Sequence, residues 1–173
     1  MSKKKWGEKI PQVRSDSDGN DYWCINDVNR ALSVAGVHGV MPDRTKPPPR
    51  WADVPEVGYV PSERVKAMDR DGVNVHTFFG NIAGIAGNTF SNPSFDEAYR
   101  LEAIQAFNDF QIEEYAQPFP GRFITLAIVP LWDVDKATAE VERTRKLGIK
   151  GISFAFPQQL GFSHIADPYW DAL

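Results

Sequence analysis

Residues 123–156 carry the pattern that decides the fold, and they read FITLAIVPLWDVDKATAEVERTRKLGIKGISFAF. A strand-sized apolar run, Phe123 to Val129, is followed by Asp133, a residue type that caps the amino end of a helix well. An amphipathic stretch then continues to Gly148, where a glycine favours the end of a helix. On this predicted helix, Val134, Ala137 and Val141 face inward, and Glu140, Glu142, Arg143, Arg145 and Lys146 face water. A second apolar run, Ile149 to Phe156, completes the pattern. This order predicts two parallel strands joined by a crossover helix.

The same alternation of strand and helix extends in both directions. Toward the N-terminus, residues 62–71 form a predicted helix, and the apolar run Val73 to Phe79 forms a predicted strand. Ser94 opens a long predicted helix with a broad apolar stripe, which reaches about Ala116. Toward the C-terminus, residues 169–173 resemble the first turn of a further helix. We therefore expect about three parallel strands with helices between them.

The side chains of the three predicted strands alternate between a bulky apolar set and a small or polar set. The bulky set consists of Val73, Val75, Ile124, Leu126, Ile128, Ile152, Phe154 and Phe156. The small or polar set consists of Asn74, His76, Thr125, Ala127, Gly151, Ser153 and Ala155. In an α/β barrel one parity contacts the helices and the other points inward, whereas a doubly wound sheet is apolar on both parities. The contrast predicts a partial TIM (β/α)8 barrel, with the bulky set against the helices and the small set inside.

The first 60 residues differ from the rest, because prolines and glycines interrupt them and no helical period is visible. We expect an irregular N-terminal arm over residues 1–60 and a partial barrel domain over residues 61–173, incomplete at its C-terminus. Within the arm, Gln12 to Arg14 and Tyr22 to Ile25 flank a turn-rich spacer. This arrangement predicts a small hairpin.

Composition excludes several classes of function. The 173 residues carry a formal net charge of -4, whereas nucleic-acid binders present a basic face, so we expect no nucleic-acid partner. No stretch approaches the roughly 20 apolar residues that a membrane span requires. Cys24 stands alone, without a disulfide partner or a Cys-x-x-Cys metal motif. We expect a cytoplasmic protein that contacts a small-molecule substrate and no membrane.

Several short words of sequence occur in order between residues 50 and 173. They are Arg50-Trp51-x-Asp53-Val54-Pro55, Glu63-Arg64-Val65-Lys66-Ala67-Met68, Ala106-Phe107-Asn108-Asp109-Phe110, Pro120-Gly121-Arg122-Phe123, Val129-Pro130-Leu131-x-Asp133, Leu147-Gly148-Ile149-Lys150-Gly151 and Asp167-Pro168-x-x-Asp171. In their order and spacing, these words resemble the amidohydrolase-related family that includes aminocarboxymuconate-semialdehyde decarboxylase.

The resemblance implies an eight-stranded barrel that holds a divalent metal, usually zinc, at the carboxyl ends of its strands. In that family the ligands are a His-x-His or similar pair on the first strand, one histidine each after the fifth and sixth strands, and an aspartate after the eighth. The strands predicted here look like the second, third and fourth, and the chain contains no His-x-His, Asp-x-His or Glu-x-His. We therefore expect an N-terminal fragment that lacks the metal-ligand strands, with no catalytic residue and no metal ligand of its own.

Three histidines are present, His38, His76 and His164, and none has a second ligand at a spacing that one strand or helix would present. His76 belongs to the predicted interior set and is a candidate substrate contact, although a histidine satisfied by backbone or hydroxyl groups would give the same pattern. His164 is a second candidate, because it follows the third strand, where barrel enzymes place substrate contacts. The glycine-rich residues 80–87 form either an active-site loop or a plain connection.

For the whole enzyme, the resemblance implies a metal-dependent hydrolase or a non-oxidative decarboxylase (a carboxy-lyase) that acts on a small carboxylated compound. The metal would activate a water or polarise the substrate. This chain would supply barrel wall and part of the substrate rim, and it would be inactive alone. The alternative is a non-catalytic interaction or assembly module, in which a partial barrel with open strand edges associates with another chain or forms a homo-oligomer.

Overall fold

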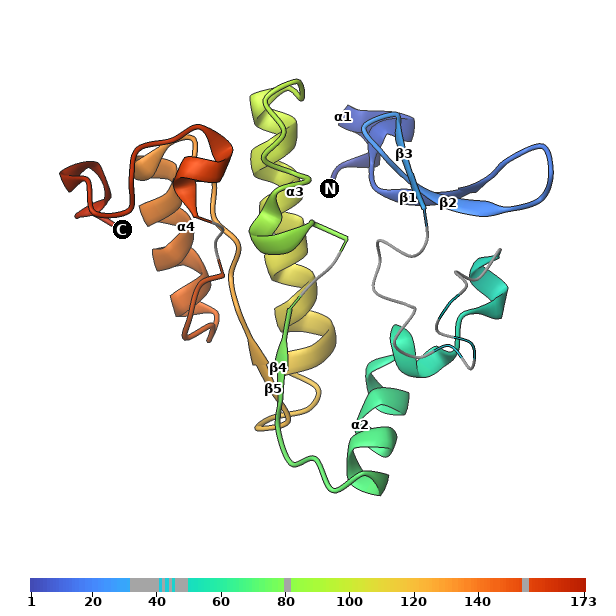
Figure 1. Ribbon diagram of the computed structural model, residues 1–173. Coiled ribbons are helices and arrows are strands. Elements are labelled where there is room, and N and C mark those ends of the chain that lie inside the picture. The colour runs from blue at the N-terminus through green and yellow to red at the C-terminus, as the bar shows by residue number, and fades with distance from the viewer. Residues whose placement is uncertain (32–40, 42, 44, 46–49, 80–81, 154–155) are drawn as a thin grey trace. The chain divides into compact units, whose positions relative to one another are not determined.

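The protein is described by a computed structural model that covers residues 1–173 except 32–40, 42, 44, 46–49, 80–81 and 154–155 (Figure 1). The chain forms two compact units, residues 1–74 and residues 75–173. The first unit includes the helix after residue 60. This helix joins the preceding segment closely, because Arg64 donates a hydrogen bond to the carbonyl of Gly58.

The first unit contains an antiparallel sheet in the order β1 (Gln12–Ser15), β2 (Asp21–Ile25) and β3 (Val28–Ala31). The predicted hairpin is confirmed as the β1–β2 pair, and β3 is an addition to the prediction. Asn26 and Asp27, which join β2 to β3, have φ angles of 49° and 62°. A type I′ turn needs positive φ at both central residues, and Asn and Asp adopt it more readily than most residues. The Asn-Asp pair is therefore the signal for the third strand.

The helices described in the first unit are short, apart from one. They are α1 (Lys3–Trp6), η1 (Gly7–Lys9), η4 (Trp51–Asp53), η5 (Glu56–Gly58) and α2 (Pro61–Arg70). Helix α2 confirms the predicted helix over residues 62–71, and it begins at a proline, which loses no helical hydrogen bond there. Trp51 lies between Trp23 and Tyr59, with ring centroids 5.6 Å and 4.9 Å away. These ring contacts hold η4 against the sheet.

The second unit alternates strands and helices, as the sequence predicts. Its elements are β4 (His76–Phe78), η6 (Ile85–Gly87), α3 (Glu97–Phe110), the π-helical turn η7 (Gln111–Ala116), β5 (Phe123–Thr125), α4 (Val134–Lys146), η8 (Pro157–Leu160) and η9 (Pro168–Trp170). Asp133 caps α4 by accepting a backbone N–H, as expected. Helix α3 is capped by Asp96 and not by Ser94, because Ser94 is engaged with Asn92 in the turn before the helix.

The sheet of the second unit is parallel but smaller than predicted. Strands β4 and β5 pair in parallel, and a single parallel bridge joins Ala127 to Ile152. Three successive segments therefore run in parallel in sequence order. The third predicted strand, residues 149–156, contributes only this bridge among the described residues, and residues 154 and 155 lie outside them. The described residues form no closed barrel, which is consistent with a partial fold.

Helix side chains satisfy the backbone just after β5, and this explains why the paired region ends early. Gln111 donates to the carbonyl of Leu126 at 3.2 Å. Asn108 donates to the carbonyl of Ile128 at 2.9 Å and accepts the N–H of the same residue at 3.0 Å. Because a side-chain amide occupies both backbone groups of Ile128, a neighbouring strand cannot pair with them.

The two faces of β5 are the reverse of the prediction. Thr125 and Ala127 are buried, whereas Ile124 is 48% exposed. Ala127 packs with Ile112 and Ile149 in a buried cluster, so the small residues face the helical side. Small side chains let a helix approach a strand closely, and bulky branched residues commonly fill the interior of a barrel. The prediction that the bulky set contacts the helices is therefore wrong for this strand.

Helix α4 buries the face predicted for it and, in addition, the polar residues Glu140 and Thr144. Ala137 is buried, and Val134 and Val141 pack against the cluster that contains Leu131. Glu140, which we expected to face water, is only 2% exposed. Its burial is possible because polar side chains surround its carboxylate, as the site geometry below shows.

Candidate functional site

The loop after β4 is packed where the structure describes it. Ala83 and Thr89 are buried, and the N–H of Thr89 donates to the carbonyl of Ala83 at 2.8 Å. Gly84 has a φ of +74°, and a Cβ at this position would lie 2.7 Å from the Thr89 hydroxyl oxygen. A larger residue would therefore disrupt the turn. The described part of this loop packs against its own chain, while residues 80 and 81 lie outside the described residues.

His76 is the first residue of β4 and pairs with Phe123, the first residue of β5. Its backbone N–H donates to the carbonyl of Arg122 at 2.9 Å. Paired residues of parallel strands point to the same face, and Phe123 contacts the ring of Tyr115 with centroids 5.2 Å apart. The expected interior position of His76 is therefore wrong. It lies on the helical side of the sheet, at the amino end of its strand.

His164 lies exposed in the loop between η8 and η9. Its Nδ1 accepts the N–H of Ala166 at 3.1 Å. Trp170 anchors the loop, because its Nε1 donates to the carbonyl of Ser163 at 3.2 Å and its ring is buried in the cluster of Leu131. The imidazole is thus held on the side of the unit where β5 ends.

The two candidate histidines belong to opposite ends of the strands. His76 begins β4, whereas His164 follows the last parallel segment, and His38 lies outside the described residues. Across the part of the chain that the structure describes, no group of three or more His, Cys, Asp or Glu side chains is placed to hold a metal ion. Of the helices described, none has the length and apolar character needed to cross a membrane.

A charged and aromatic cluster, not identified from the sequence, lies where α3 and α4 begin. The guanidinium carbon of Arg100 is 4.2 Å from the ring centroid of Trp132. Lys136 pairs with Glu97 at 2.8 Å and also with Asp133. Hydrogen bonds from this lysine lower the pKa of both carboxyls below their usual values. We call these five residues the rim cluster.

The rim cluster has chemistry suited to binding a carboxylate. The Nε of Arg100 is buried and has no hydrogen-bond partner among the described residues. A guanidinium has planar donors whose geometry matches that of a carboxylate, and its position over an aromatic ring is a favourable cation–π contact. Trp132 follows the segment that contains β5, and Arg100 lies in the first turn of α3. Both residues follow predicted strands in the chain, where barrel enzymes place functional residues. No sequence motif, however, indicates that the two side chains are in contact.

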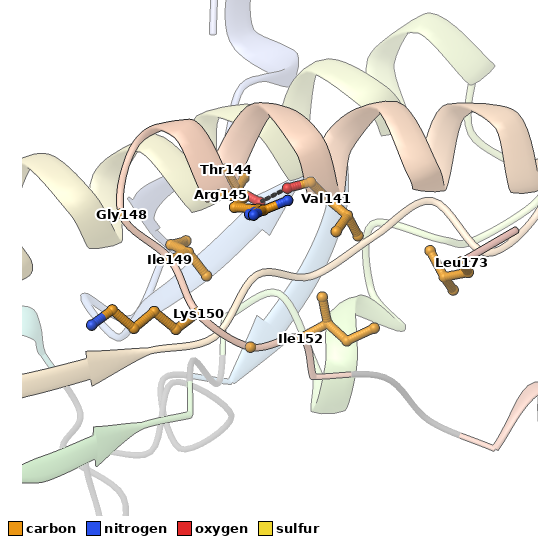
Figure 2. A pocket seen from close by; sticks show the side chains of 9 residues that line it. Val141, Thr144, Arg145, Gly148, Ile149, Lys150, Ile152 and Leu173 are labelled. Atoms are coloured by element: carbon orange, nitrogen blue, oxygen red, sulfur yellow. Dashed lines mark hydrogen bonds between the residues drawn. The ribbon is translucent and has the colours of Figure 1, made fainter.

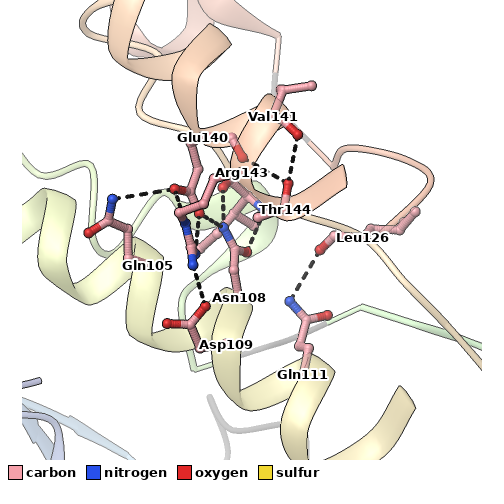
Figure 3. A network of polar contacts seen from close by, with 10 residues as sticks. Gln105, Asn108, Asp109, Gln111, Leu126, Glu140, Val141, Arg143 and Thr144 are labelled. Atoms are coloured by element: carbon pink, nitrogen blue, oxygen red, sulfur yellow. Dashed lines mark hydrogen bonds and ion pairs between the residues drawn. The ribbon is translucent and has the colours of Figure 1, made fainter. Parts of the chain in front are cut away.

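A buried polar network holds α3 against α4 (Figure 3). Glu140 accepts hydrogen bonds from Nε and Nη2 of Arg143, both at 2.8 Å, and from Asn108 at 2.7 Å. Gln105 donates to the same carboxylate at 3.4 Å, and Arg143 also donates to Asp109 at 2.6 Å. The hydrogen bonds with Glu140 raise the pKa of Arg143 above its usual value. Both oxygens of Glu140 are engaged, so this carboxylate joins the helices and is not free for acid–base chemistry.

No protein-family model matches the chain, and no curated protein matches it. Among solved structures, the chain is similar to one described as the "Crystal structure of a putative amidohydrolase from Staphylococcus aureus". The two share 26% sequence identity with a TM-score of 0.48, and the match covers 64% of this chain and 33% of that one. The chain thus spans about a third of the length of that protein.

Proposed function

We propose that the chain is an arc of a metal-dependent (β/α)-barrel enzyme of the amidohydrolase-related group. The complete enzyme would be a hydrolase or a non-oxidative decarboxylase of a small carboxylated compound. One observation carries this proposal: successive segments run in parallel in sequence order, with apolar side chains left exposed on the face opposite the helices. The order and spacing of the sequence words that resemble this family support the same assignment.

The helices cover one side of the parallel segments. Helices α3 and α4 contact each other through Asn108 and Glu140, and Ala127 packs on the same side. On the other side, Val75 and Ile124 are 47% and 48% exposed. A doubly wound sheet would cover both faces with helices, whereas a barrel places helices outside and fills its interior with branched apolar residues. The exposed face therefore fits the inside of a barrel whose other strands lie outside this chain.

The rim cluster supports a carboxylated substrate. Arg100 lies at the end of the unit where the strands finish, which is the functional end of (β/α) barrels, and it has an unused donor. We propose that it binds a substrate carboxylate. His164 remains a proposed substrate contact at the same end of the strands, whereas the position of His76 at the amino end of β4 argues against such a role.

The family resemblance also implies a divalent metal, zinc in most cases. The described residues do not fit such an ion, because they contain no suitably placed group of three ligands. We therefore derive no catalytic step through a metal in this chain. The proposed contribution of the chain is barrel wall and substrate contact.

The experiment measures zinc content and turnover of the purified 173-residue chain, together with translation of the DNA on both sides of its reading frame. We expect zinc well below one equivalent, no hydrolysis or carbon dioxide release from aromatic carboxylates, a His-x-His upstream, and two histidines with an aspartate downstream. Stoichiometric zinc with turnover by this chain alone would show that the proposal misplaces the metal centre.

A second candidate function is a non-catalytic assembly module, which the exposed Val75 and Ile124 side chains favour. Exposed apolar surface and open strand edges promote association between chains. In that case the flanking DNA would encode no ligand set, and the purified chain would form a defined oligomer or complex. Sedimentation of the chain, combined with the flanking sequence, separates the two functions.

A further inference from the structure

A groove of about 600 Å³ lies between the carboxyl end of α4 and the segment that follows it (Figure 2). We call it the α4 groove. Its lining consists of Val141, Thr144, Arg145, Gly148, Ile149, Lys150, Gly151, Ile152 and Leu173. Four of these side chains are aliphatic, and the volume falls within the roughly 300–1,000 Å³ of small-molecule sites. Figure 2 shows Lys150 and Leu173 toward opposite ends of the groove.

Two cations in the lining, Arg145 of α4 and Lys150 after it, lack ion-pair partners among the described residues, whereas Lys136 and Arg143 of α4 have them. The side chains of Arg145 and Lys150 are exposed, and neither side chain has a hydrogen bond or ion pair with any residue that the structure describes. The groove therefore combines an aliphatic surface with two uncompensated positive charges.

We propose that the α4 groove binds a small carboxylate with an aliphatic body. The aliphatic part lies against Val141, Ile152 and Leu173, and the carboxylate meets Arg145 and Lys150. This charge complementarity favours an anionic amphiphile over a neutral or cationic one. The proposal does not depend on the proposed enzyme function, since it uses none of the rim cluster.

Helix electrostatics offers another role for Arg145. Basic residues near the carboxyl end of a helix stabilise it through the helix dipole, and Lys146 is in the same turn. Lys146 does not line the groove, so it provides a matched control. Arg145 and Lys146 both stabilise the helix through its dipole, whereas only Arg145 is placed to contact a ligand in the groove.

The experiment is isothermal calorimetry of the chain with octanoate, with octanol and octylamine as neutral and cationic controls. We expect saturable octanoate binding that weakens with added salt. Arg145→Gln and Lys150→Gln should each weaken it about two- to fivefold, the range for an exposed ion pair. Lys146→Gln should leave it unchanged, and Leu173→Ala should weaken octanoate and octanol alike.

Methyl NMR identifies where octanoate binds, and circular dichroism verifies that each variant is folded. Octanoate should shift the methyl signals of Ile149 and Ile152. The proposal is overturned by absence of octanoate binding, by equal binding of octanol, by equal loss in Lys146→Gln, or by shifts confined to other methyl groups. A dimer that buries these methyl groups and resists octanoate would overturn it too, because a second copy would then occupy the groove.

Discussion

The two flanks of helix α4 differ in how completely their charges are matched. Toward α3, Glu140 and Arg143 bind each other, and Asn108 and Asp109 complete their hydrogen bonds. Toward the α4 groove, Arg145 has no partner among the described residues. One flank thus has the properties of a protein interior, and the other is an exposed surface with an unpaired positive charge.

The residues of β5 and the segment after it show the same contrast. Thr125 and Ala127 are buried on the helical side, whereas Ile124 is half exposed on the other. Burial on the covered side therefore stabilises this unit, whereas the open side contributes little buried area. Substitutions on the two sides should therefore have unequal effects on folding.

The largest expected effect is that of Asn108→Ala on the covered side. This change removes both hydrogen bonds to the backbone of Ile128 and the donor at 2.7 Å from Glu140. Because buried polar groups lose their partners, we expect the free energy of unfolding to fall by about 3 kcal/mol. Urea denaturation followed by circular dichroism measures this loss.

Glu142→Ala is the matched control, because Glu142 is an exposed residue of α4. Its effect on the free energy of unfolding should stay within about 0.5 kcal/mol. Equal losses in the two variants would mean that the buried network does not stabilise the contact between α3 and α4.

A smaller contrast is expected between the two faces of β5 and its continuation. Ala127→Leu inserts three carbons where Ala127 is fully buried beside Ile112 and Ile149, so we expect a loss of about 2 kcal/mol. Ile124→Thr changes an exposed side chain and keeps a β-branched residue, so its effect should be below about 0.5 kcal/mol. Thermal and urea unfolding of both variants test the assignment of the faces. A greater loss in Ile124→Thr would show that the covered face is the other one.

Local signals predicted the elements of the second unit better than they predicted its surfaces. Asp133 and the apolar spacing of Ala137 and Val141 located α4 correctly, because capping and periodicity depend on neighbouring residues. Alternation along β5 identified two faces but not the one that the helices cover. Glu140 was assigned to water because its burial depends on Asn108, a residue distant in the sequence.

The candidate site was less predictable, for the same reason. The strand pairing that places His76 beside Phe123 is a contact between distant residues, and strand alternation alone gave the wrong face. The stacking of Arg100 on Trp132 joins a helix start to a loop that follows β5. Neither contact can be recognised from a motif in a single sequence. The short stretches that resemble the amidohydrolase-related family predicted only the order of the elements.

The smallest expected effect concerns acid stability at the rim cluster. The hydrogen bonds of Lys136 depress the pKa values of Glu97 and Asp133 below their ordinary values of 4.5 and 3.8. A depressed carboxyl pKa stabilises the folded state above the unfolded value, and this stabilisation is lost as pH falls through the folded value. Lys136→Gln removes the ammonium but keeps the backbone N–H that donates a hydrogen bond to Asp133. The melting temperature of this variant should therefore fall less steeply than that of the unaltered protein as the pH drops from about 6 to about 3.

Lys146→Gln provides the comparison, because Lys146 is exposed and has no ion-pair partner among the described residues. Its melting temperature should follow the same acid profile as the unaltered protein. If Lys136→Gln also follows that profile, then water and salt screen the ion pairs of the rim cluster completely. Among the contacts of the rim cluster, only that of Arg100 with Trp132 would then contribute to stability. Substitutions on the buried flank of α4 would still cause the largest loss of stability.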